Sequence, residues 1–328
     1  MKKSTLMTIL LVICIAAAAV TGILLLGGEM RTVYADAGRY SAGETTLDAG
    51  AENLEIDWID GKVTVAYHPE NTITITETAP GAIPEDKAVH WWMDGNTLRI
   101  RYAKSGIILL RGLNKELTVT LPEGTKLKTA RITGTSCDLE VPAITAEELE
   151  MQTTSGGIHA GASAKKVSLG GTSGNIFGTL DGAEEITAGT TSGSISLIQT
   201  GTSRAVRLSS TSGALSIKAE EIGELNAGST SGSINVEAKK ADKTDISSTS
   251  GSITLALEAF SDLKVGTTSG SVNAALPETP GFTGDFGTTS GRFDSALALT
   301  RNGSVYSCGD GSGRCTIHTT SGNIILGK

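Results

Sequence analysis

Apolar and polar residues alternate over short stretches along most of this chain. In the stretch TTSGSISL (residues 190–197), the apolar residues Ile195 and Leu197 follow Gly193 by two and four positions. A spacing of two indicates a half-buried β-strand, because successive side chains of a strand point to opposite faces. We therefore expect a small corner at Thr-Ser-Gly that leads directly into a strand.

The same unit recurs with a period of about 19 residues. The glycines of successive Thr-Ser-Gly triplets are 18 to 21 residues apart, except for a gap of 31 before the last copy. Cys137 precedes the first of these glycines by 19 residues and marks a degenerate earlier copy, whereas the long last gap indicates an insertion. The residue two positions after the glycine is apolar in every copy. The corner glycines are Gly156, Gly174, Gly193, Gly213, Gly232, Gly251, Gly270, Gly291 and Gly322.

A regular period of this length, built from short strands, predicts an all-β fold, a β-solenoid in which coils stack on one another. Roughly ten coils at about 4.8 Å each would form a stack on the order of 50 Å long. Polar segments such as DGAEE and AKKAD are expected to be the return turns. A sandwich of ordinary hairpins is the alternative, but it would not require near-identical corners.

The corners themselves have a structural explanation. Glycine allows positive φ at little steric cost, so we expect the corner glycines to adopt it. Stacked Thr and Ser hydroxyls can form ladders that satisfy the backbone groups at a corner, and Thr191 and Ser192 are the candidates in the copy at Gly193. The sequence leaves open whether such a ladder faces the core or the solvent.

Residues 47–130 differ from the repeats and contain all three tryptophans. The segments NLEIDWIDGKVTVAYH and VHWWMDGNTLRIRY alternate around Asp-Gly pairs, which predicts two hairpins. KELTVTLPEGTKLKTARI predicts two strands joined by a Pro-Glu-Gly turn. We expect a β module that caps the N-terminal edge of the solenoid. Trp91 and Trp92 are either part of its core or a platform for sugar stacking.

The N-terminus carries an uncharged run at residues 5–28, preceded by Lys2 and Lys3. Its length is sufficient for a transmembrane helix, and the flanking lysines place the rest of the chain outside the cytoplasm. A cleaved signal peptide is the alternative, although its apolar region is usually shorter. We therefore expect a membrane anchor at 1–28, a linker at 29–46, the β module at 47–130 and the T-S-G solenoid at 131–328.

These features together resemble a known family. The hairpin segment IDGKVTV, the element LTVTLPEGTKLKTARITG and the serial TTSGSI units resemble the bacterial "putative adhesin" β-strand-repeat family, also called the toastrack domain, from about Asp48 onwards. The resemblance implies an all-β repeat fold on the outer side of the membrane. Some members of the family are linked to envelope-stress systems. It implies no catalytic residues, and the cysteine-bearing insertion departs from the usual pattern.

Composition narrows the possible partners and cofactors. The net charge of −8 argues against a general nucleic-acid binder, which needs clustered Lys and Arg. Cys308 and Cys315 either form a disulfide around CGDGSGRC or remain two thiols. No zinc spacing and no serial calcium motif is present, so we expect neither a metal nor any other cofactor.

The predicted function is binding, scaffolding or adhesion by a module anchored in the cell membrane, with a glycan or protein of the cell envelope as partner. The alternative is a polysaccharide-active enzyme on a β-helix scaffold. An enzyme predicts a cleft with clustered acidic and basic groups, whereas a binding module predicts a smooth stack. Acidic residues such as Glu184, Glu185, Glu220 and Glu221 fall in the predicted returns, which indicates solvated turns and no catalytic residue.

Overall fold

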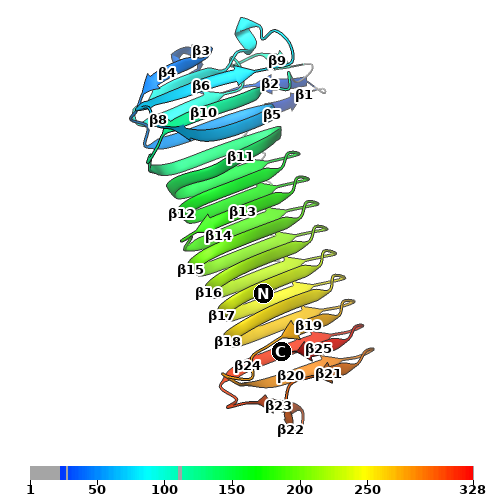
Figure 1. The fold of residues 1–328 in the computed structure, drawn as a ribbon. Coiled ribbons are helices and arrows are strands. Elements are labelled where there is room, and N and C mark those ends of the chain that lie inside the picture. The colour runs from blue at the N-terminus through cyan, green and yellow to red at the C-terminus, as the bar shows by residue number, and fades with distance from the viewer. Residues whose placement is uncertain (1–22, 27–28, 110–112, 328) are drawn as a thin grey trace. The chain divides into compact units, whose positions relative to one another are not determined.

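The computed structural model describes residues 23–26, 29–109 and 113–327, and most of them lie in β-strands (Figure 1). Within these residues there is no α-helix, and the only helical turns are the 3-10 helices η1 (Ala37–Arg39) and η2 (Glu85–Lys87). The prediction of an all-β fold is therefore confirmed. The chain divides into an N-terminal unit that ends at Gly178 and a C-terminal unit from Thr179 to Lys328.

The N-terminal unit is built around the long strand β5 (Asn53–His68). On one side β5 pairs in parallel with β8 (Thr97–Arg101) and β10 (Glu116–Pro122), and on the other with β11 (Leu127–Thr153). Antiparallel strands then extend the sheet away from β11. These strands are β7 (His90–Asp94) beside β8, β6 (Thr72–Thr78) beside β10, β4 (Thr45–Asp48) beside β6 and β3 (Ser41–Ala42) beside β7.

One of the two predicted hairpins is correct and the other is wrong. Asp94-Gly95 joins the antiparallel strands β7 and β8, and Gly95 has a φ of 58°. Asp60-Gly61, by contrast, lies inside the continuous strand β5. Gly61 has a φ of 89°, and the backbone of Lys115 lies so close that a Cβ on Gly61 would be 2.1 Å from the Lys115 carbonyl oxygen. The pair therefore bends a strand around a neighbouring segment and does not reverse the chain.

Parallel coils begin at β11. β11 pairs in parallel with β12 (Ile158–Gly171), so that Leu139 lies beside Ile158. The next strand, β13 (Ile176–Asp181), contains the boundary between the two units.

In the C-terminal unit the coils are long parallel strands in register. They follow β14 (Glu185–Thr190) and are β15 (Ile195–Ser210), β16 (Leu215–Ser229), β17 (Ile234–Ser248) and β18 (Ile253–Thr267), with β19 (Val272–Ala275) beside β18. The apolar position two residues after each corner glycine forms the core. Ile195, Leu215, Ile234, Ile253 and Val272 are each at most 1% exposed.

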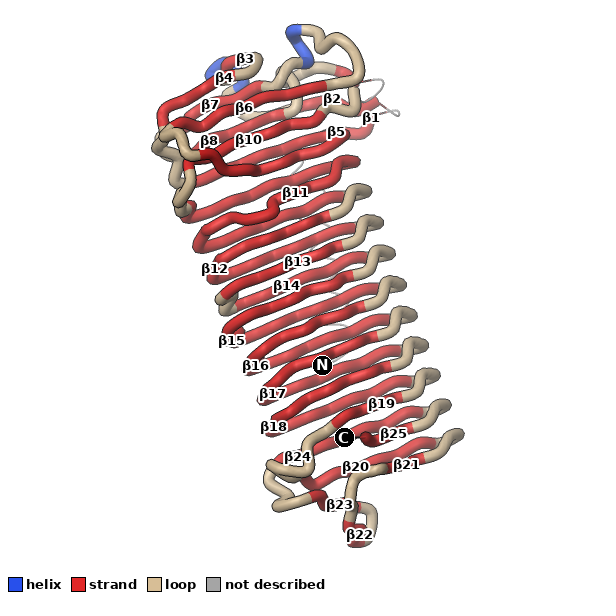
Figure 2. Tube along the Cα trace, in the orientation of Figure 1, coloured by secondary structure: helices blue, strands red, loops and turns tan. Residues whose placement is uncertain are grey.

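The strands run through several segments that were predicted to be turns. Glu220 and Glu221 lie within β16, and Lys239 and Lys240 lie within β17. In-register stacking supplies each backbone with hydrogen-bond partners in the coils on either side, so polar side chains can remain in a strand while they face solvent. In Figure 2 the recurring tan loops between the strands are the T-S-G corners.

The last copy of the repeat does not occupy the last layer. Strands β24 (Gly313–Thr319) and β25 (Ile324–Gly327) pair with β18 and β19 on one side and with β20 (Phe282–Thr288) and β21 (Phe293–Ser295) on the other. The final coil is therefore inserted between the two coils that precede it in the sequence.

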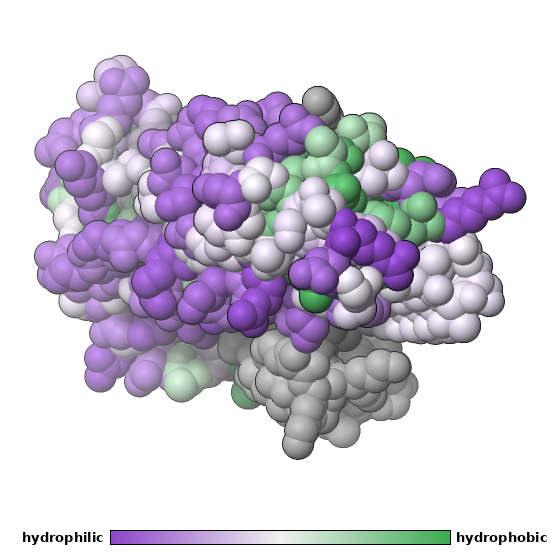
Figure 3. Space-filling view, turned by 90° about the horizontal axis from the view of Figure 1, so that it is seen from below, coloured by the Kyte–Doolittle hydropathy of each residue, from purple (hydrophilic) through white to green (hydrophobic). Residues whose placement is uncertain are grey.

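The insertion predicted from the long last gap forms a hairpin, β22 (Thr300–Asn302) and β23 (Val305–Cys308). β23 pairs antiparallel with the outer edge of β20 and so covers that edge. Phe286, Phe293 and Tyr306 pack against one another here, with ring centroids 5.0 to 5.5 Å apart. Figure 3 views the molecule from below and shows apolar residues gathered within a largely polar surface.

The predicted membrane anchor falls mostly on residues 1–22, which lie outside the described residues. Its described part contributes β1 (Ile23–Leu26), which pairs with β2 (Glu29–Thr32), and β2 pairs with β9 (Ile108–Leu109). Among the residues that the structure describes, no helix is long and apolar enough to cross a membrane. The anchor stays a prediction.

Candidate functional site

The corner glycines form a column in which each backbone lies close to the next. A Cβ on Gly174 would lie 1.7 Å from the carbonyl oxygen of Gly156, and a Cβ on Gly232 would lie 1.9 Å from that of Gly213. None of the nine corner glycines has a positive φ. The expected reason for glycine is therefore wrong: the corners need it because the adjacent coil leaves no room for a side chain.

The hydroxyl ladder faces the core and lies one residue earlier than predicted. Thr190 is 1% exposed, and its Oγ1 accepts a hydrogen bond from the Gly193 N–H at 3.2 Å. Ser229 and Ser248 accept the same bond from Gly232 and Gly251, each at 2.8 Å. Ser192 is exposed. The repeated hydroxyl three residues before the glycine therefore stabilises the stack and is not a ligand-binding array.

The two C-terminal cysteines are buried and are not joined by a disulfide. Cys308 pairs with Phe282 of β20, and Cys315 pairs with Gly284 on the opposite side of the same strand. The intervening strand holds their Cα atoms roughly 10 Å apart, beyond the approximately 7 Å that a disulfide spans. Of the two alternatives that the sequence leaves open, the structure has two thiols.

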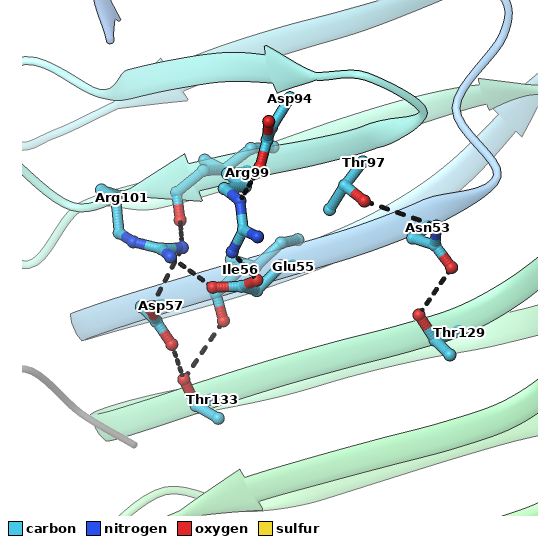
Figure 4. A network of polar contacts seen from close by, with 11 residues as sticks. Asn53, Glu55, Ile56, Asp57, Asp94, Thr97, Arg99, Arg101, Thr129 and Thr133 are labelled. Carbon is cyan, nitrogen blue, oxygen red and sulfur yellow. Dashed lines mark hydrogen bonds and ion pairs between the residues drawn. The ribbon is translucent and has the colours of Figure 1, made fainter. Parts of the chain in front are cut away.

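A charged network lies on the sheet of the N-terminal unit (Figure 4). Glu55 of β5 forms ion pairs with both Arg99 and Arg101 of β8, and Arg101 also pairs with Asp57 at 3.0 Å. On the other side of β5, Arg131 lies beside Glu55 in the strand register and pairs with Glu150 at 2.8 Å. Charges of opposite sign thus alternate from strand to strand across the sheet.

This network borders a pocket of about 230 Å³ that is lined by Glu55, Arg99, Arg131, Glu148 and Glu150 among others. Here the structure has the convergent acidic and basic groups that an enzyme would need. Glu55, however, already forms ion pairs with arginines of the adjacent strand β8, and Glu150 pairs with Arg131 of its own long strand β11. Burial raises the pKa of Asp57, while Arg101 and the Thr133 hydroxyl lower it. The arrangement braces three strands, and sequence reasoning missed it because its members are distant in the chain.

A second buried ion pair holds the same unit together. Lys115 is fully buried, and its Nζ donates to Glu77 Oε2 at 2.7 Å and to the carbonyl oxygens of Lys87 and Tyr102 at 2.7 and 2.5 Å. Burial lowers the pKa of Lys115, whereas Glu77 raises it. With all three donors occupied and no access from solvent, this lysine is suited to support and not to chemistry.

The tryptophans are mainly structural. Trp58 is 1% exposed and donates from Nε1 to the Lys115 carbonyl oxygen at 3.1 Å. Trp91 donates to the Gly43 carbonyl oxygen, and Trp92 packs edge-on against Tyr40 at 5.6 Å. Trp91 and Trp92 are half-buried, and these contacts favour a packing role in the β module over a sugar-stacking platform.

A further candidate site is a groove in the C-terminal unit with a volume of about 770 Å³. Three residues from each of four successive coils and four residues from the next coil line it, and we call it the five-coil groove. Its lining consists of residues 198–200, 218–220, 237–239, 256–258 and 275–278.

The five-coil groove has an apolar floor and a charged rim in four of its coils, whereas the coil of β15 places the buried Gln199 in the floor. The middle residue of each coil is buried, as Ala219, Ala238 and Leu257 illustrate. The rim contains two ion pairs, Lys218 with Glu237 at 2.5 Å and Lys239 with Glu220 at 2.9 Å. The arrangement can bury the apolar part of a ligand and contact its polar part along the rim. Within the described residues, no three His, Cys, Asp or Glu side chains come together as metal ligands.

Such a stack of parallel coils with a mixed β cap defines a class of all-β repeat proteins. This chain belongs to one family of that class, the toastrack family DUF4097, whose model matches residues 51–326. The family inferred from the T-S-G units is therefore confirmed. No curated protein matches the chain significantly.

Two solved structures align with most of the chain. One is a "putative cell adhesion protein" from Clostridium sporogenes, with 11% identity over 88% of this chain and 98% of that chain and a TM-score of 0.22. The other is a "putative adhesin" from Bacteroides fragilis, with 15% identity over 87% of this chain and 98% of that chain and a TM-score of 0.33.

Proposed function

We propose that this protein is a non-catalytic binding module of the cell envelope that holds an extended partner in the five-coil groove. The observation that carries the proposal is the repetition of the groove lining over five coils. A ligand that lies across the coils meets an apolar floor and a charged rim in the four coils from residue 218 onwards, and an uncharged lining in the coil of β15. Such a surface provides adhesion or scaffolding and needs no reacting group.

The proposed location is the outer side of the cell membrane, with the N-terminal run at residues 5–28 as an uncleaved anchor. The length of this run and the flanking Lys2 and Lys3 support it. The link of some toastrack proteins to envelope stress extends the proposal to a role in sensing the envelope. Protection of the C-terminal unit from an external protease in intact cells would overturn this location.

The alternative, a polysaccharide-active enzyme, is favoured by the pocket beside Glu55 and Glu150. It predicts that the full-length chain releases sugar fragments from cell-wall polysaccharide and that Glu150→Gln abolishes the release. We favour binding because both carboxylates already neutralise arginines in this pocket. Release of fragments by the wild-type chain but not by Glu150→Gln would establish the alternative.

The binding proposal is tested with the full-length chain, solubilised in detergent and mixed with isolated cell envelopes. Ala256→Trp places a large side chain on the exposed rim of the groove, and Ser231→Trp is the control at an exposed corner of the same unit. We expect Ala256→Trp to reduce the bound fraction at least fivefold and the control to leave it unchanged. Equal binding by both variants would contradict the proposal.

A further inference from the structure

We propose that two copies of this chain join through the last coil of the stack, with β21 of one copy antiparallel to β21 of the other and Phe293 opposite the partner's Phe293. We call this coil, which consists of β20, the corner at Gly291 and β21, the end coil. The contact lies outside the five-coil groove and does not depend on it. Its support comes from the exposure of the end coil, its open backbone edge and the order of its charges.

The end coil is exposed at positions that are buried in the preceding layer (Figure 1). Ile324 and Leu326 of β25, two and four residues after their corner glycine, are at most 1% exposed. At the equivalent positions of the end coil, Phe293 is half-buried and Ser295 is exposed, and Gly291 is exposed as well. Within the described part of the chain, the end coil therefore lacks the covering layer that the other coils have.

Backbone groups of β21 are directed at this open edge. β21 pairs with β25 on one side, where the Arg292 carbonyl oxygen accepts the Ile324 N–H at 2.9 Å. Because the N–H and C=O groups of successive strand residues point to opposite sides, those of Phe293 and Ser295 point away from β25. Among the described residues, β23 covers β20 over Phe282–Gly284, and no strand pairs with the outer side of β21. Such an edge is a template for a further strand.

The charges beside Phe293 make this edge complementary to itself. In an antiparallel pair that is symmetric about Phe293, Arg292 lies opposite the partner's Asp294, and Asp294 lies opposite the partner's Arg292. Both side chains are exposed, and opposite charges directly across two strands stabilise the pairing. A shift of the twofold axis by one residue would place two copies of Arg292, or two copies of Asp294, opposite each other, which is unfavourable. The sequence of β21 thus selects one register with a second copy.

The same register satisfies the backbone. With Phe293 on the twofold axis, its N–H and C=O groups exchange two hydrogen bonds with those of the other copy. A contact in which both copies use the same patch is the commonest kind in homo-oligomers. A head-to-tail stack would instead need an open coil at the start of the parallel stack, where β11 already pairs with β5.

Aromatic side chains lie beside this edge. Phe293 stacks on Phe286 with ring centroids 5.0 Å apart and packs against Tyr306 at 5.2 Å. Phe293 and Tyr306 are only half-buried. Figure 3 views this end of the C-terminal unit and shows apolar residues gathered there. A pair of copies would remove part of this apolar surface from water.

The test measures dimerisation of the full-length chain in detergent by sedimentation velocity over a range of concentrations. Arg292→Glu and Asp294→Arg each place like charges opposite each other in the pair, so each variant alone should dimerise roughly tenfold more weakly than the wild type. An equimolar mixture of the two variants restores opposite charges at both cross-strand positions. We expect this mixture to dimerise within about threefold of the wild type.

Lys243→Glu is the matched control, because it reverses an exposed charge of β17 outside the end coil. It should leave dimerisation unchanged. Urea unfolding of each variant should show a retained fold, since all three side chains are exposed.

Three results would overturn the proposal: a wild type that is monomeric at every concentration, a dimer that both reversals leave intact, or a mixture that dimerises no more tightly than the single variants. Ala256→Trp alters the five-coil groove and should leave the dimer unchanged. Loss of the dimer in that variant would place the contact in the groove and would also overturn the proposal.

Discussion

Gly213 lies directly beside Gly193 of the preceding coil, and a Cβ on Gly213 would be 1.6 Å from the Gly193 carbonyl oxygen. No real Cβ approaches an oxygen so closely. The two coils can therefore lie this close together at the corner only because residue 213 is glycine. The same restriction applies to every corner of the stack for which the contact is described. The T-S-G repetition is thus a packing requirement, and the ligand-binding positions must be sought among the residues that vary from coil to coil.

The first prediction concerns a corner glycine. Gly232→Ala should lower the free energy of unfolding by about 3 kcal/mol or more, because the new Cβ would meet the Gly213 carbonyl oxygen at 1.9 Å. Gly266→Ala is the matched control, since nothing lies within 4 Å of its Cβ position and its φ is not positive. Urea unfolding measures both. Equal effects of the two substitutions would contradict the packing explanation.

The second prediction concerns the buried ion pair of the N-terminal unit. Lys115→Met should destabilise the protein by about 3–5 kcal/mol, because Glu77 would remain buried without its cation. Adding Glu77→Leu should recover most of this loss. Lys62→Met removes a half-exposed pair with Glu140 and should cost less than about 1 kcal/mol. If the double variant were no more stable than Lys115→Met, the pair would not be the cause.

The third prediction concerns alkaline pH. Burial raises the pKa of Tyr34 to about 12, and its hydroxyl donates to the Ala103 carbonyl oxygen at 3.0 Å. The folded state therefore keeps a proton that the unfolded state loses near pH 10. The stabilisation is fully present below about pH 10 and is lost as the pH rises towards 12.

Tyr34→Phe provides the control for this pH dependence. Thermal unfolding measured between pH 10 and 12 should show a smaller decline for the variant than for the wild type. Parallel declines would show that Tyr34 does not contribute. Burial also raises the pKa of Tyr40, Tyr67 and Tyr102, so a residual decline is expected in both proteins.

The fourth prediction concerns the thiols. Burial raises the pKa of Cys137 to about 12 and raises that of Cys315, which suppresses the reactive thiolate. In a Cys14→Ser background, maleimide should label no cysteine of the native protein and three after denaturation without reductant. Labelling of Cys137 alone after denaturation would show that Cys308 and Cys315 form a disulfide after all.

Much of the repeat region was predictable because stacking forces equivalent residues into equivalent positions. The apolar residue two positions after the glycine, such as Ile234, is buried as the period of two indicates. The reason for the glycine was not predictable, because the sequence of one repeat does not show how closely the backbone of the next coil approaches it. The place of the last coil was also hidden, since Ile324 fits beside Val272 as well as it would fit at the end of the stack.

The charged network was hidden for a different reason. Arg99 and Glu55 are 44 residues apart and meet only because β5 and β8 are parallel neighbours. Sequence alternation shows which side chains share a face of one strand, but it does not show which strands pair. The wrong prediction of a hairpin at Gly61 also hid the strand pairing, because a hairpin there would have divided β5 into two strands.

The central claim is that the five-coil groove holds the partner of this protein. The most direct measurement places a photo-crosslinking amino acid at position 256 or, as the control, at position 231 of the full-length chain in intact cells. Both positions are exposed, and only position 256 lines the groove. We predict a discrete crosslinked species from position 256 and none from position 231. Crosslinking of equal strength at both positions, or at position 231 alone, would contradict the claim.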